Sequence, residues 1–108
     1  MFNDLYDAIS FLWSCRWPSE QGSITEVLVE HLHPNERNER YRLSITYKFS
    51  VGTDGPYTGE DFWNPYFSTK GRSHAAEHKF HVGQPITVRY RSDDPSENRL
   101  DRSTWRQI

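Results

Sequence analysis

The sequence predicts a mainly β protein: a small antiparallel sheet or partly closed barrel, with an N-terminal amphipathic helix and one short connecting helix. Apolar and polar side chains alternate from Tyr41 to Val51 and again from Ile86 to Tyr90, the period of half-buried strands. With 108 residues, of which 15% are aromatic, the chain suffices for one aromatic-rich core. We therefore expect a helix over 1–16 docked on a single β-rich domain over 17–108.

The N-terminal helix is predicted from apolar spacing. Asn3 is a suitable cap, and Leu5, Ile9 and Leu12 follow at four- and three-residue steps. The helix should end before Pro18, because the residue ahead of a proline avoids helical angles. Its apolar face is broad, so contact with a membrane surface or with a second copy of the chain is the alternative to docking. We predict no membrane-spanning segment.

The first strands follow from side-chain parity. Ile24 has the opposite parity to Val27 and Val29, so all three can face inward only if a bulge lies at Thr25 and Glu26. The long strand from Tyr41 to Val51 comes next. Gly52 to Pro56 supplies a turn, and Tyr57 to Phe62 is predicted to return as the second arm of a hairpin.

The second half of the chain contains the connecting helix and the last predicted strand. The helix is expected from Ser73, its predicted cap, to about His81, followed by Gly83. Ile86 to Tyr90 then forms a strand. Residues Ser92 to Ser96 have the composition of a turn, and Leu100 with Trp105 is expected to close the core from a short final segment.

Several short patterns occur in a characteristic order: Trp17-Pro18, Gly22-x-Ile24, the strand centred on Tyr47, Asp54-Gly55-x-Tyr57-x-Gly59, Val82-Gly83-x-x-Ile86-x-Val88-x-Tyr90 and Asp94-Pro95-x-x-x-x-Leu100. In these, from about Trp17 to Leu100, the chain resembles a bacterial family, domain of unknown function 3592. The resemblance implies a small domain of antiparallel strands with no assigned activity and no established catalytic residues. The resemblance also implies that such domains are often attached to membrane-spanning helices, whereas only a short charged helix is predicted at that place in this chain.

Composition excludes several classes of function. The formal net charge of −2 and the pI near 6.2 provide no overall field that would hold nucleic acid or an anionic membrane, so any such binding must come from a local patch. Cys15 is the single cysteine, so neither an intrachain disulfide nor a multi-cysteine metal site can form. We expect a soluble protein of a reducing, cytoplasmic compartment that binds no cofactor.

A zinc-binding pattern, H-x-x-E-H, is present at His74, Glu77 and His78. On a helix the two imidazoles share one face and could occupy two corners of a zinc tetrahedron. A zinc hydrolase needs a third protein ligand, and His81 is the weak candidate for it. A solvated face of a short connecting helix explains the pattern better, so we predict no catalytic residue and no metal site.

The aromatic loop after the first hairpin is the strongest candidate for a binding surface. It contains Phe62, Trp63, Tyr66 and Phe67, and rings of this kind anchor many protein interfaces. The function predicted from them is a non-catalytic interaction module for an unidentified protein partner, with a homo-oligomer as one form of it. The alternative for the loop is a lid over the domain's own core.

Single-stranded nucleic acid is the alternative ligand. Arg42 and Lys48 share one strand face, Arg89 and Arg91 share another, and the four would form a basic strip if the two strands were neighbours. Nearby aromatic rings could then stack on bases. We expect instead that these cations pair with acids of adjacent segments, namely Glu26, Glu30, Glu60 and Asp61.

Overall fold

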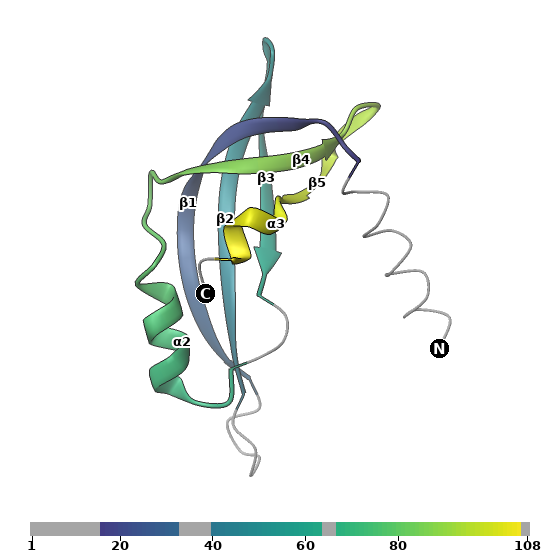
Figure 1. Cartoon of the computed structure of the whole chain (residues 1–108). Coiled ribbons are helices and arrows are strands. Elements are labelled where there is room, and N and C mark those ends of the chain that lie inside the picture. The colour runs from purple at the N-terminus through teal and green to yellow at the C-terminus, as the bar shows by residue number, and fades with distance from the viewer. Residues whose placement is uncertain (1–15, 33–39, 64–66, 107–108) are drawn as a thin grey trace, which may run out of the picture.

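The computed structural model describes residues 16–32, 40–63 and 67–106. Five strands form one antiparallel sheet in the order β3-β2-β1-β4-β5 (Figure 1). They are β1 Ser19–Leu32, β2 Arg40–Val51, β3 Asp54–Phe62, β4 Pro85–Arg91 and β5 Asp94–Leu100, with helices α2 Lys70–Glu77 and α3 Arg102–Trp105. The mainly β class is confirmed. Residues 1–15 of the predicted N-terminal helix lie outside the described residues.

The bulge predicted in β1 is confirmed by its pairing with β2. Ile24 pairs with Tyr47, but the next matched pair is Glu26 with Thr46, so one residue of β1 is extra. The shift changes which side chains face inward. As a result Ile24 is buried in the core, and Val27 and Val29, of opposite parity, pack against that core as well.

The alternation of β2 is also confirmed, and it supplies the centre of the core. Leu43, Ile45 and Tyr47 have no exposed surface, and Phe49 has almost none. Side chains of β4, β5, α2 and the segment after α2 complete the core: Ala76, Phe80, Ile86, Val88, Tyr90 and Leu100. The core therefore lies on one side of a strongly curved sheet.

The β2–β3 and β4–β5 hairpins each have a turn of two residues. Gly52 and Thr53 join β2 to β3, and Gly52 has a φ of +59°, which glycine adopts without strain. Ser92 and Asp93 join β4 to β5. The turn predicted over Ser92 to Ser96 was therefore too long. Asp94 is the first residue of β5. Its carboxylate accepts hydrogen bonds from the backbone N–H and the hydroxyl of Ser96, so residues typical of turns stabilise the beginning of a strand here.

The expectation of a partly closed barrel was wrong, because β3 and β5 remain the two edges of an open sheet. No backbone ladder joins the two edges, but side chains of β2 and β3 form hydrogen bonds with β5. The Leu100 N–H donates to Asp61 Oδ2 at 3.1 Å. Tyr47 Oη donates to Asn98 Oδ1 at 2.6 Å and passes so close to Gly59 that a Cβ there would lie 2.6 Å from the phenol oxygen.

The connecting helix exists, but it begins and ends earlier than predicted. Its N-cap is Thr69, whose Oγ1 accepts from the Arg72 N–H at 3.3 Å. Ser73, the predicted cap, is fully buried inside the helix and donates its hydroxyl to the Lys70 carbonyl at 2.7 Å. The helix ends at Glu77, so His81 lies beyond it.

Candidate binding cleft

A cleft of about 560 Å³ opens where the end of β3, the end of β5 and helix α3 meet. We call it the tryptophan cleft. Its wall is made by eight residues: Asp61, Phe62, Trp63, Arg99, Leu100, Arg102, Trp105 and Arg106. In the cartoon α3 lies beside the end of β5 and is drawn across the sheet (Figure 1). A volume of this size lies within the range of roughly 300–1,000 Å³ that is typical of ligand sites.

Aromatic rings form the apolar part of the cleft. The Trp63 and Trp105 ring centroids are 5.8 Å apart, and the Phe67 ring stacks on Trp63 with a centroid distance of 6.5 Å. Phe80 meets Trp105 edge-on at 6.1 Å, which connects the cleft wall to the core. Trp63, Phe67 and Trp105 are all half-buried. The rings are thus supported by the core while part of each remains accessible.

Backbone hydrogen bonds hold both ends of the aromatic loop, Trp63 and Phe67, against β2. The Trp63 N–H donates to the Leu43 carbonyl at 2.9 Å, and Tyr41 and Phe67 exchange two bonds at 2.8 and 2.9 Å. These bonds continue the β2–β3 ladder on both sides of residues 64–66. Of the predicted loop residues, Phe62 and Trp63 line the cleft and Phe67 supports it. Tyr66 lies outside the described residues.

Asp61 is a carboxylate on the inner side of the sheet, opposite Ile45. Its Oδ1 accepts from the Phe62 N–H at 2.9 Å and its Oδ2 from the Leu100 N–H. Burial raises the pKa of Asp61, and this effect outweighs the two backbone bonds and the positive charge of Arg99, which act in the opposite direction. The cleft therefore contains a partly desolvated acid at the junction of the sheet edges.

Arginine supplies the positive charge of the cleft. Arg99 comes from β5, Arg102 from the first position of α3, and Arg106 from its C-cap, where it is exposed. Asp101, which precedes Arg102, is the N-cap of α3. Its carboxylate forms an ion pair with Arg89 at 2.9 Å. The wall of the cleft thus has three guanidinium groups and one carboxylate.

Of the eight residues of the cleft wall, the sequence patterns predicted only Phe62 and Trp63 as binding residues. Leu100 and Trp105 were predicted to close the core: Leu100 is buried in it and Trp105 packs against it, but the patterns did not indicate a role for the arginines near them. The signal present in the sequence is the spacing of Arg99, Arg102 and Arg106 around a tryptophan. This spacing indicates a cleft only if β5 lies close to β3, and no local sequence pattern predicts that the two strands are close.

The basic strip that nucleic-acid binding required is not assembled. Strand β1 lies between β2 and β4, so Arg42 is not beside Arg89 or Arg91. Arg42 pairs with Glu30 at 2.7 Å and lies 4.1 Å from the centroid of the Phe62 ring. Arg89 pairs with Asp101, and Arg91 pairs with Asp93 and Glu97 at 2.7 and 3.1 Å.

The histidines of the zinc pattern lie on and after α2. His74 approaches Glu77 at 3.9 Å, while His78 caps the helix and is exposed. His81 follows the helix end, and its backbone N–H donates to Gln84 Oε1 at 3.0 Å. Among the described residues, no group of three His, Cys, Asp or Glu side chains is placed to hold a metal ion.

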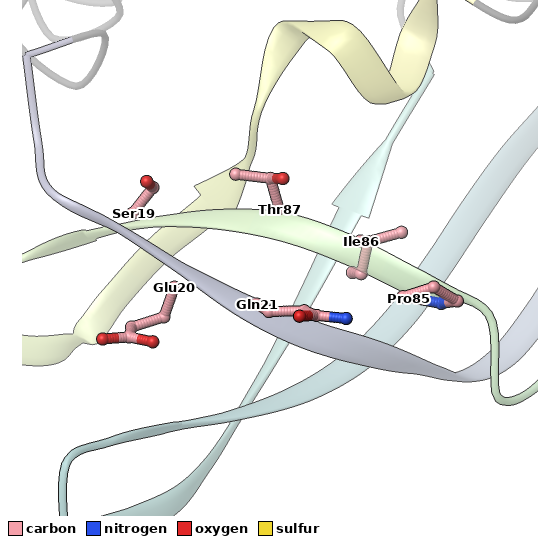
Figure 2. Close-up of a pocket in the computed structure, with 6 residues that line it drawn as sticks. All are labelled: Ser19, Glu20, Gln21, Pro85, Ile86 and Thr87. Carbon is pink, nitrogen blue, oxygen red and sulfur yellow. The ribbon is translucent and has the colours of Figure 1, made fainter.

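A second hollow, of about 300 Å³, lies where the beginning of β1 pairs with β4, and six residues line it: Ser19, Glu20, Gln21, Pro85, Ile86 and Thr87. Figure 2 shows the Ser19 and Thr87 side chains on one side of the two ribbons and Glu20 on the other. Alternate residues of a strand point to opposite faces, so these groups do not converge. This hollow offers neither a nucleophile with its base nor a cluster of charge.

Comparisons with known proteins identify the family of the chain and leave the activity open. Within the described ranges no helix is both long and apolar enough to cross a membrane. Neither the curated proteins nor the solved structures gave a match. The family model described as "Domain of unknown function (DUF3592)" matches residues 20–105. The match includes all five strands, apart from the first residue of β1, Ser19. It also includes seven of the eight residues that line the tryptophan cleft, and leaves out Arg106. The chain therefore belongs to the DUF3592 family, as its sequence patterns predicted.

Proposed function

We propose that the protein is a non-catalytic interaction module that binds a protein partner through the tryptophan cleft. The observation that carries this proposal is the combination of half-buried Trp63 and Trp105 with three arginines around one open cleft. Tryptophan and arginine are the residue types most enriched among the anchors of protein interfaces. The one carboxylate of the wall, Asp61, accepts two backbone hydrogen bonds and has no histidine or nucleophilic side chain beside it in the wall.

The described residues of the aromatic loop, Phe62, Trp63 and Phe67, are compatible with a lid over the core and with a binding surface. Its backbone is bonded to β2 and its rings pack on the core, as a lid requires. The same bonds hold Trp63 in a fixed position at the edge of the cleft, so little conformational entropy is lost when a partner contacts it. A second copy of this chain is one candidate partner. The single cysteine favours a reducing location, and we propose the cytoplasm.

The proposal is tested by capture of partners from the native host with the wild-type chain and with two cleft variants, Trp63→Ala and Arg106→Glu. Both should lose the same partner, because one removes an apolar anchor and the other reverses a charge at the rim. Circular dichroism verifies the fold of each variant. Arg106 is exposed, so its replacement keeps the test valid even if Trp63→Ala unfolds.

Two control variants change matched residues outside the cleft. Val82→Ala removes an exposed apolar side chain, 71% accessible, and Arg72→Glu reverses an exposed charge on α2. Both should keep the partner. A partner retained by folded Arg106→Glu and folded Trp63→Ala, or lost equally with the controls, would show that binding occurs elsewhere on the molecule.

A further inference from the structure

We propose that the tryptophan cleft is the docking site for the N-terminal segment of the same chain, residues 1–15, which occupies the cleft when no partner is bound. The segment lies outside the described residues. Its docking goes beyond the proposed function, because it requires no partner protein. Three observations support it: the place where the segment joins the domain, the accessible rings of the cleft, and the apolar face that the sequence predicts for the segment.

The segment joins the domain beside helix α3. The Trp17 carbonyl accepts a hydrogen bond from Arg89 Nη1 at 2.9 Å, and the same guanidinium donates through Nε to Asp101 Oδ1 at 2.9 Å. Asp101 is the N-cap of α3, and the residues on both sides of it line the cleft. The Tyr90 N–H donates to the Pro18 carbonyl at 3.1 Å, which fixes the backbone at this point. One guanidinium group therefore separates the attachment point of the segment from the cap of α3.

The segment is long enough to lie along the cleft. In the helix that its sequence predicts, residues 1–15 would span about 22 Å, at 1.5 Å per residue. Helix α3 has four residues, so it extends only about 6 Å from its cap to Trp105. The residue ahead of Pro18 avoids helical angles, which allows the chain to change direction before β1. The segment can therefore turn back along α3 and reach both tryptophans.

The surface that the cleft leaves unsatisfied is mainly aromatic. Trp63 and Trp105 are half-buried, with ring centroids 5.8 Å apart. Arg99 and Arg102, in contrast, already take part in interactions of their own. Removing apolar surface from water contributes roughly 25 cal/mol per Å². An occupant with apolar side chains is therefore stabilised by covering the accessible parts of both rings.

Other exposed apolar side chains do not form a comparable surface. Among the described residues, the exposed large apolar side chains are Leu28 and Val82, at 43% and 71%. Leu28 lies on β1 and Val82 follows α2, so the two are on different elements. Within the described part of the chain, the tryptophan cleft is thus the better match for an apolar helix face.

The sequence of the segment provides such a face. Leu5, Ile9 and Leu12 recur at four- and three-residue steps, while Asp7 and Ser10 lie on the opposite side of the predicted helix. An amphipathic helix that lays apolar side chains at this spacing into a groove is a common mode of recognition. Because the segment is part of the chain, its effective concentration at the cleft is on the order of millimolar. A modest apolar contact is then sufficient for docking.

The test places a nitroxide spin label on the segment of the full chain. Cys15→Ser removes the single cysteine, and Ser10→Cys attaches the label to the polar side of the predicted helix. The label broadens ¹⁵N NMR signals that are close to it. The indole N–H signals of Trp63 and Trp105 should therefore lose most of their intensity. Ile9→Ser should restore the intensity, and the matched control Asp7→Asn should not.

Three outcomes would overturn the proposal. Indole signals of full intensity in the labelled chain would show that the segment does not reach the cleft. Broadening that persists unchanged in Ile9→Ser would show that the tether alone, without apolar docking, brings the label close. Broadening that appears only when ¹⁵N-enriched chain without label is mixed with labelled chain would place the segment in the cleft of a second copy. Unchanged backbone signals of β2 verify the fold of each variant.

The docked segment and a partner would compete for the cleft, so the two proposals can be separated. If a cleft-dependent partner exists, Ile9→Ser should increase its capture, because a larger fraction of the clefts is free. If Ile9-dependent broadening is observed but no partner depends on Trp63 or Arg106, the interaction function is wrong and the docking stands. If a cleft-dependent partner is captured while the labelled segment leaves both indole signals unchanged, the docking is wrong and the interaction function stands.

Discussion

A single residue, Asp61, connects the site to the stability of the fold. It follows a glutamate on an edge strand, where the sequence suggests a solvated acid, yet it faces the core side of the sheet opposite Ile45. Both of its oxygens accept backbone N–H groups, one of them from the opposite edge strand. The carboxyl group therefore holds two backbone segments together, although it is partly removed from water.

The pKa of Asp61 gives a prediction for the dependence of stability on pH. Because burial raises this pKa above 3.8, the folded chain holds the proton more tightly than the unfolded chain. The contribution of Asp61 to the free energy of unfolding is therefore most favourable at low pH and falls as pH rises from 3.8 through the raised pKa. The difference between wild type and Asp61→Asn, measured by urea denaturation, should decline across that window and then stay constant.

Asp101 provides a control of opposite sign. The hydrogen bond from Ser103 lowers the pKa of Asp101, although its partial burial acts the other way. Its contribution is present above 3.8 and is lost as pH falls through the lowered pKa. The difference between wild type and Asp101→Asn should thus shrink below pH 3.8. If both differences change in the same direction, the assignment of the Asp61 effect to burial is wrong.

At the scale of elements, the sequence predicted the strands that have a long alternating pattern. It did not predict correctly the elements whose ends depend on a capping residue or whose pairing depends on residues far away in the sequence. The strand around Tyr47 and the bulge after Ile24 follow from side-chain parity alone. Strand β5 has no alternation of apolar residues, because its edge is bonded through Asp61 and Asn98, so its sequence resembles a turn. One side of the cleft wall comes from β5 and the segment after it. For this reason the sequence predicted only Phe62 and Trp63, on the other side of the cleft, as site residues.

The start of α2 shows how local chemistry can mislead. Thr69 and Ser73 are both good caps by residue type, and Gly71 lowers the helix propensity of the first turn. The structure selects Thr69 because burying Ser73 brings Ala76 and Phe80 into the core. Packing of the apolar face therefore decided where the helix begins.

This choice gives a prediction at the scale of the element. Thr69→Ala should reduce the free energy of unfolding by about 1 kcal/mol, because the Arg72 N–H loses its acceptor. Thr69→Ser keeps the oxygen and should restore most of that loss. Urea denaturation of the three chains measures both changes. Equal losses in Thr69→Ala and Thr69→Ser would indicate that the threonine methyl group, and not the cap, stabilises the helix.

At the scale of the whole molecule, side-chain hydrogen bonds connect edge strand β5 to β2 and β3 across the open sheet. Tyr47 lies at the centre of the core and Asn98 on edge strand β5, 51 residues away in sequence. Burial is the main reason that the pKa of Tyr47 is raised, so its phenol stays protonated and donates to Asn98 Oδ1. The Asn98 amide in turn donates to the Pro95 carbonyl at 3.0 Å, which orders the start of the same strand.

A double-mutant cycle tests whether this link couples the sheet edge to the core. Tyr47→Phe and Asn98→Ala should each destabilise the fold, because each leaves the other polar group without its partner. Combined, they should destabilise by less than the sum, with a coupling of about 0.5–3 kcal/mol. Tyr47→Phe combined with the distant Thr69→Ala should be additive. Additivity of both pairs in urea denaturation would mean that the hydrogen bond contributes nothing, and that the curvature bringing Trp63 and Trp105 together is maintained by apolar packing alone.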